Sequence, residues 1–356
     1  MSKKIRVGIL YGGQSAEHEI SILSARNVLA ALDRERFEPV LVGIDKSGKW
    51  LQQDEQRLLA SARDPRQVRV EPGLPAPVES TAQQVDVVFP VLHGTLGEDG
   101  AMQGLLEVAG IPYVGAGVLG SAVGMDKDVM KRLLRDADIP IADFHTVRSE
   151  RFLADPAGVC RTLLPLGFPM FTKPANAGSS VGVRKVKSEA ELEDAVRFAL
   201  LHDGKAIVEQ RIVGREIELA VLGGSPPTVS IAGEIVVEHA DGFYSYDAKY
   251  LDEKGARLEM PAKLAAVDLA RAQALALRTF EVLECDGLAR VDLFFAPDGT
   301  FYVNEINTLP GFTAISMYPK LWALSGLPQQ ELFSRLIDLA LKRALERARI
   351  RHNYGA

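Results

Sequence analysis

Apolar and polar residues follow two different periods in the first third of the chain. Nearly continuous apolar runs predict buried strands at residues 5–13, 37–45 and 85–94. Helical periodicity predicts two connecting helices, at 15–32 with Ser15 as its cap and at 100–110. Strands that alternate with helices in this way are typical of an open parallel sheet covered by helices.

The pattern changes after residue 115, where the chain becomes rich in glycine and alanine. Helices are predicted at residues 125–138, 188–201, 266–283 and 329–349. Strands are predicted around them, together with a hairpin at 288–307 and a long polar loop at 240–258. We therefore expect an α/β protein with three domains, at residues 1–115, 116–213 and 214–356.

The composition narrows the class of protein. Hydrophobic residues make up 47% and charged residues 25% of the chain, as in globular proteins. A net charge of −6 gives no support for nucleic-acid binding, and no window approaches the ~20 apolar residues of a membrane span. We therefore expect neither nucleic acid nor membrane as a partner. The two cysteines, Cys160 and Cys285, have no metal-binding spacing, and so few cysteines in a chain of this length indicate a reducing cytoplasm.

Two glycine-rich motifs resemble nucleotide-binding fingerprints without their required context. GAGVLG at 115–120 fits the dinucleotide pattern, but a charged helix follows where a strand ending in an acidic residue belongs. GIDKSGKW at 43–50 lacks the hydroxyl residue of a P-loop, because Trp50 stands in its place. A nucleotide, if bound, is therefore expected to use another device.

The strand at 301–307 begins apolar and ends polar. Period-two alternation places Phe301, Val303, Glu305 and Asn307 on one face. A packed strand rarely ends its buried face with a carboxylate and a carboxamide. The change indicates either an end that emerges into solvent or a binding site.

The hairpin sequence places further polar side chains beside this strand end. A tight turn at 298–299 sets Asp292 opposite Glu305 and Arg290 opposite Asn307. A loop one residue longer would separate this set unless a bulge restored it. Facing carboxylates normally need a cation, and oxygen ligands suit Mg²⁺; the alternative is a salt-bridge patch around Arg290.

A second element supplies positive charge and a flexible loop. The strand at 171–174 delivers Lys173 and leads into the small residues 178–182, whose N–H groups and hydroxyls can approach phosphate closely. Lys127 and Lys249 would add positive charge. A flexible hairpin tip is the structural alternative.

Together these segments resemble the ATP-grasp superfamily and, more closely, the D-alanine–D-alanine ligase family. The resemblance covers nearly the whole chain. Its motifs, in order, are GGQSAEHEIS (12–21), HGTLGEDG (93–100), MDK (125–127), KPANAGSSVG (173–182), YSYDAKY (244–250), RVD (290–292) and NEINTLPGFT (304–313). It implies an ATP-grasp fold, in which an N-terminal open parallel α/β domain precedes two α+β domains that clasp ATP.

The resemblance also implies the role of each matching residue. Contacts to ATP, from its phosphates to its ribose and adenine, are expected from Lys127, Lys173, Ser180, Lys249, Glu209, Gln210, Ile212 and Glu216, although the family often has lysine where this chain has Gln210. Two Mg²⁺ ions, with Mn²⁺ as an alternative, are expected on Asp292, Glu305 and Asn307.

The substrate side follows in the same way. Glu17 is expected to receive the ammonium of a first D-alanine, assisted by Ser179 and Tyr250, with His93 nearby. The remaining implied contacts are Arg290 and the Gly311 N–H at the oxyanion, and Ser316 with Met317 at the second carboxylate.

The implied reaction joins two D-alanine molecules through an acyl phosphate, at the expense of ATP, for peptidoglycan precursors. The loops 240–258 and 176–182 are expected to act as lids against water. The family also implies a homodimer, and Tyr250 in the AKY motif favours a dipeptide product.

Three alternatives remain open at this point. Another ATP-grasp carboxylate–amine ligase would share the metal and lysine positions but not Glu17, His93 and Tyr250 together. An NAD-dependent dehydrogenase would use GAGVLG and leave the cluster at 292–307 unexplained. A non-catalytic regulator would bind Mg-ATP without turnover.

Overall fold

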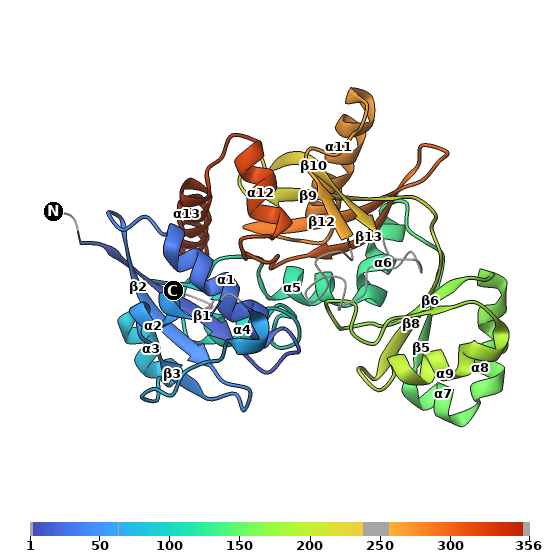
Figure 1. Cartoon of the computed structure of the whole chain (residues 1–356), viewed down its shortest axis with the longest axis horizontal. Coiled ribbons are helices and arrows are strands. Elements are labelled where there is room, and N and C mark those ends of the chain that lie inside the picture. The colour runs from blue at the N-terminus through green and yellow to red at the C-terminus, as the bar shows by residue number, and fades with distance from the viewer. Residues whose placement is uncertain (1–2, 63, 238–255, 352–356) are drawn as a thin grey trace.

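The computed structural model describes residues 3–62, 64–237 and 256–351. Three sheets lie along its long axis (Figure 1). Across the parts of the chain that are described, none of the helices combines the length and apolar character that a bilayer crossing requires.

The first sheet has the order β3-β2-β1-β4. Its strands are β1 (Ile5–Gly12), β2 (Phe37–Ile44), β3 (Trp50–Gln52) and β4 (Val87–Val91). β1 pairs in parallel with β2 and β4, as predicted, while β3 is an antiparallel edge. The helices of this part are α1 (His18–Ala31), α2 (Glu55–Ala60), the short η1 (Pro65–Gln67), α3 (Val78–Gln84) and α4 (Ala101–Val108).

The predicted cap of the first helix is wrong. α1 begins at His18 with Glu17 at the N-cap position. The Ser15 hydroxyl instead accepts a hydrogen bond from the Glu17 N–H at 3.2 Å and donates one to the His93 carbonyl at 2.6 Å. Ser15 thus ties the loop after β1 to the loop after β4, and Glu17 is left at the end of the sheet.

Two helices, α5 (Val118–Met125) and α6 (Lys127–Asp136), follow the first sheet. The GAGVLG segment forms a loop and the first turn of α5, and α6 comes directly after it. This arrangement lacks the βαβ unit of a dinucleotide site, in agreement with the sequence argument against one.

A small antiparallel sheet follows in the order β5-β8-β6-β7. Its strands are β5 (Phe144–Arg148), β6 (Met170–Pro174), β7 (Arg184–Val186) and β8 (Lys205–Gln210). The helices α7 (Ser149–Ala154), α8 (Pro156–Leu163) and α9 (Glu189–Ala199), with the short η2 (Leu164–Leu166), cover one face and share an apolar core with it (Figure 1).

The last sheet is antiparallel, in the order β11-β10-β9-β12-β13. Its strands are β9 (Arg215–Leu222), β10 (Thr228–Val237), β11 (Ala256–Glu259), β12 (Leu288–Phe295) and β13 (Phe301–Asn307). α11 (Ala266–Val282) packs on one face, while α12 (Met317–Leu324) and α13 (Gln329–Arg347) close the other side toward the first sheet.

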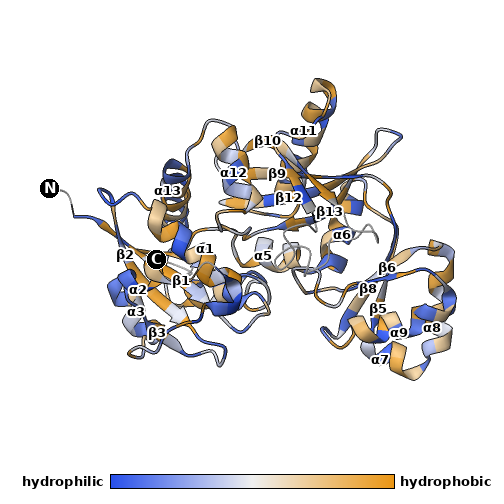
Figure 2. Cartoon of the chain, viewed as in Figure 1, coloured by the Kyte–Doolittle hydropathy of each residue, from blue (hydrophilic) through white to orange (hydrophobic). Residues whose placement is uncertain are grey.

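One apolar core joins the first and last parts of the chain. Phe89 of β4 packs edge-to-face against Phe312 and Phe333, with ring centroids 5.5 and 5.7 Å apart. Figure 2 shows hydrophobic residues concentrated in the strands, for example in β10. The first part also has an apolar cluster of its own, around Leu10, Val88 and Leu106. The domain boundaries after residues 115 and 213 stay a prediction.

The hairpin β12–β13 has the predicted pairing, but it reaches that pairing by another route. Ala296 pairs with Thr300, so the loop holds three residues rather than two. Leu293 pairs with Val303, whereas its neighbour Asp292 pairs with Glu305, so a β-bulge lies between these two pairs. The bulge restores Asp292 opposite Glu305 and Arg290 opposite Asn307.

The same bulge overturns the expected continuous face of 301–307. Phe301 and Val303 are buried in the core under α11, together with Ile306. Glu305 and Asn307 lie on the other face, because the extra residue shifts the alternation by one. The polar residues at the end of the strand therefore lie on the opposite face of the sheet from Phe301 and Val303, where they line a cavity.

Candidate active site

Two adjoining cavities lie where the three sheets meet. The first is lined from the N-terminal loops, the segment 305–317 and β12, and the second from β6, β8, β9 and β12. Lys127, Gly178, Ser179, Glu218 and Glu305 line both. A molecule in one cavity would therefore meet a molecule in the other at these residues.

Glu17 and Ser179 close one end of the first cavity. The Ser179 hydroxyl donates a hydrogen bond to Glu17 Oε1, and only 8% of Glu17 is exposed. Glu17 Oε2 lies so close to Gly94 and Gly178 that a Cβ at either position would stand 2.7 or 2.9 Å from it. Glycine at both positions leaves this oxygen accessible to a small cationic group.

His93 lines the same cavity, but both of its ring nitrogens are already occupied. Nδ1 lies 3.1 Å from the Leu309 carbonyl, which can only accept, so Nδ1 carries the proton. Nε2 then accepts from the Ser24 hydroxyl at 3.0 Å, and that hydroxyl accepts from the Phe312 N–H at 3.2 Å. Burial lowers the pKa of His93 and favours this neutral form. The ring holds the segment 309–312 against the N-terminal sheet.

That segment carries Gly311, whose Cα lies against Ser316. A Cβ at Gly311 would stand 2.8 Å from Ser316 Oγ. Ser316 Oγ is fixed by the Thr313 N–H at 3.0 Å, and α12 begins at the next residue, Met317. Backbone N–H groups at a helix start lack helical partners and suit an anion.

Arg290 lines the first cavity and is bound by two carboxylates. Its Nε and Nη2 donate to the two Asp292 oxygens, each at 2.7 Å, and Nε lies 3.1 Å from Glu218. Burial would lower the pKa of Arg290, but Asp292 and Glu218 outweigh it and raise that pKa. Nη1 has no hydrogen-bond partner among the described residues, so one N–H edge remains for a ligand.

The donors of Asp292, Glu305 and Asn307 fit a hard cation chemically. The three residues occupy neighbouring positions on one face of β12 and β13 and offer two carboxylates and one amide oxygen. Asn307 Oδ1 accepts from the Leu309 N–H at 3.1 Å and keeps a second lone pair. Within the described residues there is no group of three His, Cys, Asp or Glu side chains arranged to hold a metal. A phosphate-bearing ligand would have to complete the coordination.

Lys173 and Glu209 form a buried ion pair in the wall of the second cavity. Glu209 lies between Lys173 and Lys131, whose Nζ is 3.1 Å from Glu209 Oε2. Burial would raise the pKa of Glu209, but the two ammonium groups outweigh it and lower that pKa to about 2. The structure thus places the Glu209 carboxylate against two lysines rather than leaving it open to contact the adenine of ATP.

The loop 178–182 separates the two cavities. Ser179 and Ser180 have φ of +48° and +59°, a left-handed conformation that is uncommon for residues other than glycine and that often occurs at ligand-binding loops. Lys127 Nζ donates to the Ala177 carbonyl at 2.8 Å and lies 3.6 Å from Glu305.

The remaining predicted residues fall into two groups. Gln210, Ile212 and Glu216 line the second cavity, beside apolar residues such as Phe171 and Phe294. Lys249, Tyr250 and most of the loop 240–258 lie outside the described residues.

Three residues of the site were missed by the sequence analysis: Lys131, Glu218 and Glu98. Glu98 is 6% exposed and lines the first cavity near Glu17. Its Oε1 accepts from the Gly94 N–H at 2.9 Å, whereas Oε2 has no partner in the described chain. Its position in a glycine-flanked turn after a buried strand was the available signal.

Replacing Glu98 with glutamine tests its protonation. Burial, reinforced by Glu17, raises the pKa of Glu98 well above its usual range. A carboxyl with a raised folded pKa stabilises the fold below its unfolded pKa, near 4.5, and loses this contribution as pH rises through the folded pKa. We expect the variant to gain stability relative to the unaltered protein between pH 5 and 9, measured by urea unfolding. A constant difference across this range would contradict a proton on Glu98.

The fold and these paired cavities define an ATP-grasp ligase, an enzyme that activates a carboxylate with ATP and passes it to a nucleophile. Comparison of the chain with known protein families identifies the family within this class. The family descriptions "D-ala D-ala ligase N-terminus" and "D-ala D-ala ligase C-terminus" match residues 6–116 and 133–338. The chain belongs to the D-alanine–D-alanine ligase family and is an ATP-dependent ligase, which confirms the predicted family and fold class.

Individual relatives agree over nearly their whole length. D-alanine–D-alanine ligase A of Chromobacterium violaceum is 51% identical over 355 residues, 96% of each chain. The enzyme of the same name from Escherichia coli K12 is 49% identical over 357 residues, 96% of this chain and 97% of the relative.

Two solved structures share the fold. The D-alanine–D-alanine ligase of Coxiella burnetii superposes with a TM-score of 0.83 at 38% identity, over 98% of this chain and 97% of the other. VanG D-Ala:D-Ser ligase of Enterococcus faecalis also superposes with a TM-score of 0.83, at 33% identity, over 95% of this chain and 100% of the other.

Proposed function

We propose that this protein joins two D-alanine molecules into D-alanyl-D-alanine, with release of ADP and phosphate, to supply peptidoglycan synthesis. The observation that carries the proposal is the junction of the two cavities at Lys127, Ser179 and Glu305. An amino acid in the first cavity and the terminal phosphate of ATP in the second would meet there. Family membership identifies the amino acid.

ATP would occupy the second cavity. Its base would lie among the apolar side chains and the segment 210–212, with Glu216 at the ribose. Lys173, Lys127 and the N–H groups of 178–182 would bind the phosphates. Burial would lower the pKa of Lys173, but Glu209 and Glu305 together outweigh it and raise that pKa, so Lys173 keeps its charge.

Mg²⁺ or Mn²⁺ would be held by Asp292, Glu305 and Asn307 together with phosphate oxygens. When bound, the metal would offset the negative charge of the phosphoryl group during transfer. A pair of ions, as predicted, would require the phosphates as shared ligands.

The first D-alanine would place its ammonium at Glu17, assisted by Ser179, and its carboxylate toward Lys127. A carboxylate oxygen attacks the γ-phosphorus, the bond from that phosphorus to ADP breaks, and an acyl phosphate forms. The carboxylate has thereby gained a good leaving group. The proposed roles of Tyr250 and Lys249 stay predictions outside the described residues.

The second D-alanine would bind with its carboxylate at Ser316 and the N–H of Met317. After losing a proton, its amine attacks the acyl carbon, and the negative charge develops on the carbonyl oxygen. The Arg290 Nη1 edge and the Gly311 N–H would stabilise that charge. Collapse of the intermediate expels phosphate, the nitrogen loses its second proton, and the peptide bond remains.

The test is phosphate release from Mg-ATP with D-alanine, L-alanine, D-serine, or D-lactate plus D-alanine. We expect turnover mainly with D-alanine, and the dipeptide by mass spectrometry. A product with D-serine would move the enzyme toward the activity named for VanG. Binding of ATP without turnover on any of these substrates would overturn the assignment of D-alanine as the substrate.

Two further inferences rest on this function. We infer that the enzyme works in the cytoplasm, where ATP is available. We also infer a homodimer, which sedimentation equilibrium would test: a monomer at the assay concentration would overturn it.

A further inference from the structure

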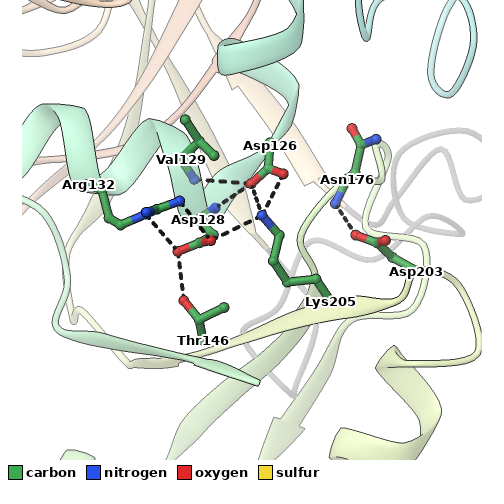
Figure 3. A network of polar contacts seen from close by, with 8 residues as sticks. All are labelled: Asp126, Asp128, Val129, Arg132, Thr146, Asn176, Asp203 and Lys205. Atoms are coloured by element: carbon green, nitrogen blue, oxygen red, sulfur yellow. Dashed lines mark hydrogen bonds and ion pairs between the residues drawn. The ribbon is translucent and has the colours of Figure 1, made fainter. Parts of the chain in front are cut away.

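Lys205 lies outside both cavities, yet its contacts converge on the elements that form the phosphate side of the site. It is the first residue of β8, and its side chain is 13% exposed. Its Nζ donates to Asp126 Oδ1 at 2.7 Å, Asp126 Oδ2 at 2.6 Å and Asp128 Oδ2 at 3.1 Å (Figure 3). One ammonium group therefore bridges two carboxylates of a neighbouring element.

Those carboxylates belong to the start of α6. Asp126 is the N-cap residue, and its Oδ1 accepts from the N–H groups of Asp128 and Val129 at 3.1 and 3.0 Å. Asp128 Oδ1 accepts from the Thr146 hydroxyl of β5 at 2.7 Å (Figure 3). The first turn of α6 is thus fixed to the small sheet from two strands.

Lys127 stands between these two aspartates. Its side chain points away from them, to the Ala177 carbonyl and Glu305 at the junction of the cavities. Its direction depends on the orientation of the first turn of α6. Lys205 and Thr146 are the contacts that hold that turn against the small sheet.

The main chain of Lys205 acts on the same region. Its carbonyl accepts from the Ala175 N–H at 2.8 Å, and the Ala175 carbonyl accepts from the Lys127 N–H at 2.9 Å. Beside it, the Asn176 N–H donates to Asp203 at 2.9 Å (Figure 3). The residues that lead into the loop 178–182 are therefore attached to the start of β8.

The positive charge of the Lys205 side chain has a second effect. Asp126 and Asp128 place two negative charges beside Lys127, close to where anionic phosphates would bind. Arg132 contacts only Asp128, at 3.2 Å, so Lys205 is the cation that offsets Asp126 among the described residues. Without it, an uncompensated carboxylate would repel the nucleotide.

The geometry points to Lys205 as a positioning residue for the phosphate subsite, which holds Lys127 and the loop 178–182 in place and neutralises Asp126. This inference rests on the proposed function and adds a residue that touches neither ATP nor D-alanine. The competing explanation is an ion pair that only attaches α6 to the sheet.

The experiment compares Lys205→Met, Lys205→Arg and the double variant Asp126→Asn with Lys205→Met. We expect Lys205→Met to raise KM for ATP about tenfold or more, with KM for D-alanine changed less than about twofold. Lys205→Arg keeps the charge and should restore KM for ATP to within about threefold. In the double variant, asparagine still caps α6 but carries no charge, so KM for ATP should fall part of the way back.

Arg197→Met is the matched control. It also removes a cation from an ion pair in this part of the chain, Arg197 with Glu193 at 2.8 Å on α9. The contacts of Arg197 are with Glu193 and the Phe152 ring, not with the start of α6. We expect its KM for ATP to match that of the unaltered protein. Circular dichroism melting of every variant shows whether it is folded at the assay temperature.

Two results would overturn the inference. One is a folded Lys205→Met variant whose KM for ATP stays within twofold of the unaltered value. The other is a lower melting temperature with no change in KM, which would indicate attachment only. If the unaltered protein showed no turnover, the proposed function would fail; ATP binding by calorimetry in the same variants would still decide the role of Lys205.

Discussion

Replacing Arg290 with lysine is expected to lower kcat by about 100-fold or more, since loss of one oxyanion donor typically costs that much. Lysine keeps the positive charge between Asp292 and Glu218, so the protein should remain folded. It cannot supply the planar fork that binds Asp292 with two nitrogens and keeps Nη1 without a hydrogen-bond partner in the described chain. KM for ATP should change little, and steady-state phosphate release measures both constants.

Arg215→Lys is the matched control for this change. Arg215 lies on β9 of the same sheet and binds Glu234 with two nitrogens, at 2.8 and 2.6 Å, but it lines neither cavity. Its kcat should equal that of the unaltered protein. An Arg290→Lys variant that turned over at more than a third of the unaltered rate would exclude the oxyanion role.

Replacing Glu209 with glutamine should lower the free energy of unfolding by about 3 kcal/mol, the lower end of the cost of breaking a buried ion pair. The change leaves the ammonium groups of Lys131 and Lys173 without their shared counter-charge. Lys131 is 1% exposed, so bulk solvent does not reach its ammonium group to replace that counter-charge. KM for ATP should rise as well, because Lys173 loses the partner that fixes it. Urea unfolding and steady-state kinetics measure the two effects.

The pH dependence of this loss has a definite sign. A carboxyl whose folded pKa is about 2 stabilises the fold above its unfolded pKa, near 4.5, and loses this contribution as pH falls toward 2. The stability difference between the unaltered protein and Glu209→Gln should therefore be largest near neutral pH and shrink below about pH 4.5. A difference that grew on acidification would contradict the ion-pair account.

A double variant isolates the charge effect. Lys131→Met removes one of the two stranded ammonium groups with a side chain of similar length. Combined with Glu209→Gln, it should be more stable than Glu209→Gln alone. If the double variant were the less stable of the two, packing rather than charge would explain the loss.

The fold was largely readable from local patterns. The parallel sheet at the N-terminus, the hairpin and the helices α1, α4, α6, α9, α11 and α13 follow from periodicity and turn residues, whereas short helices such as α7, α8 and α12 were not predicted. The pairing of Asp292 with Glu305 was predicted from a two-residue turn, whereas the structure has a three-residue loop and a bulge. The extra loop residue and the bulge cancel each other, so the pairing is the predicted one. The position of a bulge depends on the packing of both faces of the sheet, which the local sequence does not show.

The candidate site was less accessible to sequence reasoning. Residues in distinctive motifs, such as Glu17 and the loop 178–182, could be named from their resemblance to a family. Lys131 and Glu218 lie within ordinary amphipathic segments, where a charged residue is normally taken as solvated. Only the packing of α6 and β9 against their neighbours buries them. The tautomer of His93 likewise depends on Leu309, which is 216 residues distant.

The core shared between Phe89 and the segment 312–340 has a consequence for synthesis of the chain. The first hundred residues leave the ribosome well before Phe312, Phe333 and α13 exist. Until those residues emerge, β4 and α1 expose apolar surface that nothing else in the described chain covers. The small sheet with α7, α8 and α9 has a core of its own and can close earlier. The N-terminal sheet also has a cluster of its own on its other side. The middle of this protein can therefore fold during translation, while the side of the N-terminal sheet that carries Phe89 is completed only when α13 emerges.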